Sequence, residues 1–270
     1  MAVAKDQAGD LLRRRYLQVL LIVGVAVILL FIGYLVFMKE MLERTLSSPP
    51  PGQQYSAEEA RAMMELGMNA IQGSLHALVA FMGTVLALSL MCYSVRGEIS
   101  RGTIRMVLSR PIRRYEYVIG KWLGCVFTVL VYYVLMGVLV TGYTYYTAGR
   151  LLSFVPVSLA MGFLKAVMVG SVGMALSIVL HPLLSLTIAY FCAAETFLFI
   201  SKYLSGTAEQ IVKIPFYILP SYKALDTYGA IITGVTISAG EIAYRSAYAL
   251  LLSVLMVTIA ARLFRKRDLI

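Results

Sequence analysis

Lys165 and Glu195 are the two charged residues that lie deepest within the long apolar segments of this sequence. A charge inside a bilayer is costly, so such residues usually pair and often take part in transport. A tight turn expected near residue 181 would make the two segments antiparallel neighbours, with Lys165 and Glu195 about 24 and 21 Å from the turn. We therefore predict that they pair, either as a structural clamp or within a transport path. A Lys165 side chain that extends to the membrane surface is the alternative.

Sulfur and imidazole side chains gather near the start of one apolar segment, where His76 follows Met63, Met64 and Met68. Such a set could bind Cu(I), but methionines at helical spacing more often fill apolar space. The sequence has no Ser/His/Asp set, no paired carboxylates and no His-Glu-x-x-His motif. We predict no catalytic, cofactor-binding or metal-binding residues, and no enzyme activity in this chain.

The composition points to a membrane protein. Of the 270 residues, 60% are apolar and 14% are charged, against about 25% charged in a soluble domain. The net charge of +10 comes from Lys and Arg residues that cluster at the ends of apolar runs. This placement is typical of membrane topology rather than of a nucleic-acid-binding face. We therefore expect membrane lipid as a partner and no nucleic acid.

Six apolar runs are long enough to cross about 30 Å of hydrocarbon as helices. Because backbone amides in lipid must be bonded within their own segment, each run should be helical. The predicted fold is all-α, a polytopic membrane protein with one permease domain over residues 1–270. Its transmembrane helices are expected at about 17–38, 74–95, 122–146, 158–180, 183–203 and 246–264.

The positions of Lys and Arg predict the orientation. Most precede the first span, follow the last span or lie in the loop 96–121. By the positive-inside rule, both termini and this loop are cytoplasmic, whereas 39–73 and 204–245 are outer loops. Ser56 and Glu59 have the spacing of a capping box, so a helix should run from about Ser56 into the second span. The apolar, proline-broken segment 204–245 should dip part way into the membrane or pack against the bundle.

The loop 96–121 predicts a short helix, a break at Pro111 and a second helix that leads into the third span. One face of the first helix is largely apolar, and the opposite face carries Arg101, Arg105 and Ser109. Such a helix can lie on the membrane or dock on a cytoplasmic partner. Periodicity alone leaves open a third reading, in which the basic residues only set the topology.

The order of landmarks in this loop resembles the permease subunits of ABC-2 type exporters. Those permeases show E-x-x-x-G-T, then L-S-x-P-x-S/R-R, then G-K at the next span; Arg113 stands where Ser is common. The corresponding residues are Glu98, Gly102-Thr103, Leu108-Ser109-Arg110-Pro111, Arg113-Arg114 and Gly120-Lys121. The resemblance implies a coupling helix between spans two and three that docks on a separate ATPase. It assigns coupling roles to Glu98, Arg101, Gly102, Thr103, Arg105, Ser109, Pro111, Arg113, Arg114, Gly120 and Lys121.

The resemblance also implies partners and location. Two ABC ATPase subunits would bind ATP and Mg, and a second copy of this chain or a homologous permease would complete a multi-pass exporter in the cell membrane. The sequence lacks a P-loop, since Gly120-Lys121 is followed by Trp122 rather than Ser or Thr. The alternative is a secondary transporter or channel that works alone, which would favour inverted repeats and broken helices.

Overall fold

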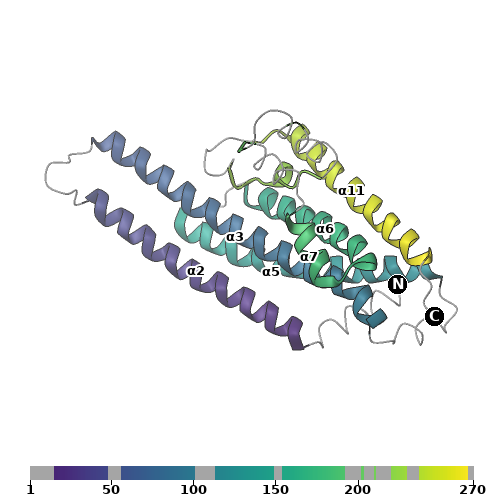
Figure 1. Cartoon of the computed structure of the whole chain (residues 1–270). Helices are drawn as coiled ribbons and strands as arrows, with labels where there is room; N and C mark the ends of the chain where they lie inside the picture. Colours follow the sequence, from purple (N-terminus) through teal and green to yellow (C-terminus); the bar gives the residue numbers. More distant parts are fainter. Residues whose placement is uncertain are drawn as a thin grey trace.

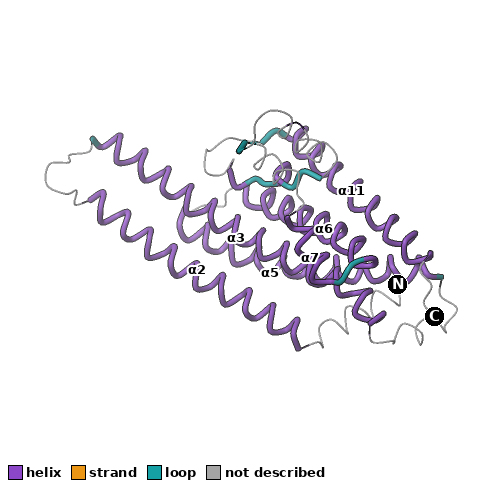
Figure 2. The backbone as a smooth tube through the Cα atoms, in the orientation of Figure 1, coloured by secondary structure: helices purple, strands orange, loops and turns teal. Residues whose placement is uncertain are grey.

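The structure, a computed structural model, describes residues 15–47, 56–100, 113–148, 154–191, 202–203, 210, 220–229 and 237–266. Over these residues the chain is helical and contains no strand, as Figures 1 and 2 show. The elements are α2 (Arg15–Ser47), α3 (Ala57–Ser100), α5 (Arg114–Ala148), α6 (Phe154–Val179), α7 (Pro182–Phe191), the 3-10 helix η1 (Lys223–Leu225) and α11 (Ala239–Lys266). The predicted all-α class is confirmed.

Five helices are long and apolar enough to cross a membrane, namely α2, α3, α5, α6 and α11. They coincide with the first, second, third, fourth and sixth predicted spans. The fifth predicted span, 183–203, begins as the shorter apolar helix α7. Residues 192–201 lie outside the described residues, so the full length of this span stays a prediction.

Side chains at the helix ends explain where several helices begin. Ser56 and Glu59 form the predicted capping box, in which the Glu59 amide donates to Ser56 Oγ (3.2 Å) and the Ser56 amide donates to Glu59 Oε2 (2.8 Å). At α5, the Arg113 amide donates to Glu116 Oε2 at 3.2 Å in the same way. Pro182 opens α7, at the first helical position where its missing N–H costs nothing.

The helix α3 is much longer than a membrane crossing requires. Its 44 residues extend over about 66 Å, against about 30 Å of hydrocarbon. Figure 1 shows α2 and α3 running side by side and projecting together beyond the other helices. Much of the predicted outer loop 39–73 is therefore helical, with α2 continuing to Ser47 and α3 starting at Ala57.

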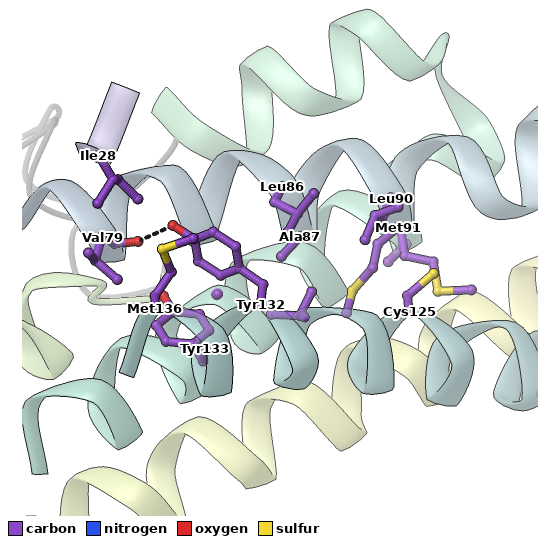
Figure 3. Packing of buried hydrophobic residues seen from close by; sticks show 14 of the residues in the cluster. Ile28, Val79, Leu86, Ala87, Leu90, Met91, Cys125, Tyr132, Tyr133 and Met136 are labelled. Atoms are coloured by element: carbon purple, nitrogen blue, oxygen red, sulfur yellow. Dashed lines mark hydrogen bonds between the residues drawn. The ribbon is translucent and has the colours of Figure 1, made fainter. Parts of the chain in front are cut away.

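The core is built where α6 packs against α3 through small residues. A Cβ atom at Gly170 would lie 2.6 Å from Met91 Sδ, and one at Gly173 would lie 2.7 Å from Leu88 Cδ2. Glycine at these positions lets the two backbones approach closely, as is common between membrane helices. The helix α5 joins the same core. Figure 3 shows Tyr132 of α5 beside α3, where its hydroxyl donates to the Val79 carbonyl at 3.1 Å.

Candidate functional site

The two ends of the loop between α3 and α5 are joined by a buried ion pair. Glu98 lies near the end of α3 and Lys121 lies two turns into α5, and Lys121 Nζ pairs with Glu98 Oε1. The Tyr117 hydroxyl donates to the other carboxylate oxygen, Glu98 Oε2, at 2.5 Å. Glu98 and Lys121 are 9% and 7% exposed, and Tyr117 is fully buried. We call Glu98, Tyr117 and Lys121 the basal clamp, and the end of the bundle that holds them the basal end.

Helix geometry places the clamp residues on facing surfaces. Tyr117 and Lys121 are four residues apart on α5, so both side chains lie on the same face of that helix. This face is turned toward α3, where Glu98 accepts from both. Lys121 Nζ also lies 5.6 Å from the centre of the Tyr117 ring, within the range of a cation–π interaction. Because the pair is buried, removing one charge would take from the other its ion-pair partner in a low dielectric, which is costly.

The end of α11 packs on the same clamp. The Phe264 ring stacks on the Tyr117 ring, with 5.6 Å between centroids and 26° between planes. Arg114 Nη1 donates to the Arg265 carbonyl at 3.2 Å, which satisfies a carbonyl group at the end of a helix and complements its dipole. The basal clamp therefore ties α3, α5 and α11 together beside the loop.

Only part of the predicted coupling set lies within the described residues. Glu98 and Lys121 are brought together, Gly120 is half-buried, and Arg114 contacts α11 as above. Arg113 is exposed and donates from Nη1 to the Tyr115 hydroxyl at 3.0 Å, an interaction that raises the pKa of its guanidinium. The remaining candidates lie outside the described residues: Arg101, Gly102, Thr103, Arg105, Ser109 and Pro111. Tyr117 was not predicted as a functional residue, although its spacing of four residues from Lys121 places both on one face of a helix.

Lys165 is part of a second ion pair, nearer the other end of the bundle, which we call the distal end. Its partner in the structure is Asp226, a residue that was not predicted from the sequence. Glu195 lies outside the described residues, so the predicted Lys165–Glu195 pair stays a prediction. Lys165 lies about three turns, or roughly 16 Å, from the start of α6.

Asp226 belongs to residues 220–229, which we call the distal segment. Three further hydrogen bonds hold this segment against helices. Thr227 Oγ1 donates to Ser158 Oγ of α6 (3.0 Å), the Tyr222 hydroxyl donates to the Ala189 carbonyl of α7 (2.9 Å), and the Ser221 amide donates to the Tyr248 hydroxyl of α11 (3.0 Å). This part of the apolar region 204–245 thus packs against the bundle, one of the two arrangements predicted for it.

The candidate Cu(I) group lies along the single helix α3, where Met63 is about 20 Å and Met68 about 12 Å from His76. His76 is 4% exposed, and its ring lies edge-on to Phe154 with 5.9 Å between centroids. Across the part of the chain that the structure describes, there is no group of three His, Cys, Asp or Glu residues that could hold a metal ion.

Long apolar helices packed through small residues define a polytopic α-helical membrane protein. The chain belongs to the ABC-2 transporter family, because the family model described as "ABC-2 family transporter protein" matches residues 1–269. The predicted resemblance is confirmed, and the chain is a permease of an ABC transporter. No curated protein matches the chain.

Proposed function

We propose that this chain is the membrane-spanning subunit of an ATP-driven exporter, and that the basal clamp passes the movement of a docked ATPase to the spans. Two copies of an ABC ATPase would hold ATP and Mg, and two permeases, identical or homologous, would form the pathway. The loop between Glu98 and Lys121 would be the docking element.

The observation that carries this proposal is the closure of the loop by the Glu98–Lys121 pair. A loop with independent ends could move without moving the spans. Here the two ends are fixed to each other, and Tyr117 and Arg114 connect them to α11. A displacement of the docked loop would therefore shift α3, α5 and α11 together at the basal end.

The unbroken helix α3 could carry a movement from the basal end to the distal end. The helix runs without a break from the basal clamp to the distal projection, and it packs closely on α6 through Gly170 and Gly173. A tilt that starts at Glu98 would therefore appear at the distal end, where the Lys165–Asp226 pair lies. Such packed elements tend to switch between discrete arrangements rather than deform.

The charge distribution supports a cytoplasmic basal end and a location in the cell membrane. Exposed cationic side chains gather there at the start of α5 and the end of α11, as positive-inside topology requires. They are Arg113, Arg114, Arg262, Arg265 and Lys266. This orientation would place both termini and the docking loop on the side where ATP is available.

Co-purification tests the proposed partner. The tagged chain is purified in mild detergent from its own cells, and bound proteins are identified by mass spectrometry. We expect an ABC ATPase in about equimolar amount with the wild-type chain, which the R101E/R105E variant loses. The matched variant R44E/R61E places two equal charge reversals at the distal end and should retain it. No ATPase with the wild-type chain, or equal recovery with both variants, would contradict the proposal.

A further inference from the structure

The two halves of the Lys165–Asp226 pair differ in their freedom to move. Lys165 belongs to α6. Of the five described helices that could span a membrane, α6 has the largest buried share, with 67% of its most apolar 18-residue stretch inside the bundle. Asp226 follows the short 3-10 helix η1 and belongs to the distal segment, which is not part of a spanning helix. The distal segment can therefore shift without disrupting a spanning helix, whereas Lys165 cannot leave the bundle.

Because only Asp226 can move with the distal segment, a displacement of that segment would separate the two charges. Asp226 would be hydrated at the distal surface. Lys165 would remain among apolar side chains, where an unpaired charge is strongly disfavoured. An arrangement in which the distal segment is displaced is therefore favourable only if another anion takes the place of the Asp226 carboxylate.

Tyr133 provides a second, independent sign of an incomplete site beside this pair. Its ring fits against Gly83 of α3 and Gly162 of α6 and contacts Phe163 edge-on, with 5.9 Å between centroids. The hydroxyl lies beside Gly162, which is about 4.5 Å along α6 from Lys165. Tyr133 is 5% exposed, and its buried hydroxyl has no hydrogen-bond partner among the described residues. Buried hydroxyl groups normally have one.

Two further buried polar side chains on α3, nearer the distal end, have atoms without a hydrogen-bond partner among the described residues. Gln72 and His76 lie one turn apart and are 3% and 4% exposed. Gln72 Oε1 and both ring nitrogens of His76 lack a hydrogen-bond partner within the described part of the chain. Together with the Tyr133 hydroxyl, these atoms form a row of polar groups along α3 that have no hydrogen-bond partner among the described residues. A ligand at Lys165 could satisfy the Tyr133 hydroxyl, whereas His76 packs on Phe154, about 16 Å along α6 from Lys165.

We propose that Lys165 binds a carboxylate or phosphate of the transported molecule. In the arrangement seen in the structure, the Asp226 carboxylate takes the place of that anion beside Lys165. This inference rests on the proposed transport function and specifies the substrate class. The distal segment and α6 also bring apolar side chains to the same cluster, including Met161, Met168 and Leu225. These surroundings favour an amphiphile with an anionic head group over a small hydrophilic anion.

The single tryptophan of the chain offers a direct probe. Trp122 donates from Nε1 to Ser171 Oγ of α6 at 2.9 Å, and Ser171 lies about 9 Å along the helix from Lys165. Energy transfer from Trp122 to an anthroyloxy-labelled fatty acid should therefore report its binding to the purified chain. We expect saturable transfer that hexadecyl phosphate displaces and hexadecyltrimethylammonium does not. The methyl ester of the same probe should show no saturable component.

Two substitutions with opposite expected signs separate an anion site from a structural latch. K165Q should weaken binding about tenfold or more because it removes the cation. D226N should strengthen binding about threefold, because the resident competitor loses its charge. The matched variant R245Q, at the exposed Arg245–Glu241 pair of α11, should leave binding unchanged. If K165Q does not fold, K165R should keep the preference for acid over ester.

Equal weakening by K165Q and D226N, or equal binding of acid and ester, would overturn the inference and leave the pair as a structural latch. The binding assay contains no ATPase. A failure here would therefore leave the proposed coupling function standing, and the loss of ATPase co-purification would not affect this result.

Discussion

Glu98 at the end of α3 and Lys121 near the start of α5 form a buried ion pair that closes the loop between the two helices. The pairing joins two of the positions by which the chain resembles ABC-2 permeases. The end of α11 packs at the same place, where Phe264 stacks on Tyr117 of α5. The same contacts that stabilise the basal end would therefore pass on a force applied to the loop.

Double-mutant stability measurements test the clamp itself. Both E98Q and K121M should lower the free energy of unfolding by about 3–5 kcal/mol, because each leaves a buried charge without its partner. The double variant should lose less than the sum of the two single losses. Thermal or denaturant unfolding in detergent provides the measurement, with the exposed pair variant E241Q/R245Q as a control that should change stability by about 1 kcal/mol or less. Additive losses would show that Glu98 and Lys121 do not interact.

Close packing between α3 and α6 can be tested with alanine. G170A places a Cβ atom 2.6 Å from Met91 Sδ and 3.3 Å from the Ala87 carbonyl oxygen, and should cost about 1–3 kcal/mol of stability. G142A on α5 meets nothing within 4 Å and should be neutral or stabilising by up to about 1 kcal/mol. Equal melting temperatures of the two variants would contradict the close approach of α3 and α6.

The ion-pair partner of Lys165 can be identified by comparing two double-mutant cycles. K165M combined with D226N should show a coupling energy of about 0.5–3 kcal/mol in detergent unfolding. K165M combined with E195Q tests the pair that was predicted from the turn position alone. Coupling only with Glu195 would contradict the arrangement of the distal segment, whereas coupling with both would indicate a shared network of three charges.

The orientation is open to labelling with an impermeant thiol reagent in whole cells. The background lacks Cys92, Cys125 and Cys192, and single cysteines replace residues that the structure leaves exposed. M63C and Y228C should react from outside, because they belong to the predicted outer loops. R113C should react only after permeabilisation. The reverse pattern would place the docking loop away from ATP and exclude the coupling proposal.

Much of the fold was predictable because lipid imposes strict requirements. Apolar runs near 20 residues must be helices in a bilayer, and Ser56 with Glu59 marks the start of α3 through its capping chemistry. The sequence did not predict how far α2 continues, because the segment 39–47 is charged and resembles a loop. Helical pairing across the α2–α3 hairpin stabilises it beyond the membrane length.

The candidate sites were less predictable because they depend on how helices face one another. Glu98 and Lys121 were both singled out by family resemblance, but their contact depends on the relative rotation of α3 and α5. Asp226 was missed for a different reason. It directly follows the single-turn helix η1, in a stretch too short to show a periodicity that would fix its path.

The most direct test of the coupling proposal measures distal movement driven by ATP. Spin labels at M63C of α3 and Y244C of α11, both exposed in the structure, report their separation in the purified permease–ATPase complex. The wild-type separation should change between the nucleotide-free and the vanadate-trapped complex. In E98Q/K121Q, which removes both charges of the pair, ATP hydrolysis should continue while the separation stays constant. An unchanged ATP-driven shift in this variant would contradict the role of the Glu98–Lys121 pair.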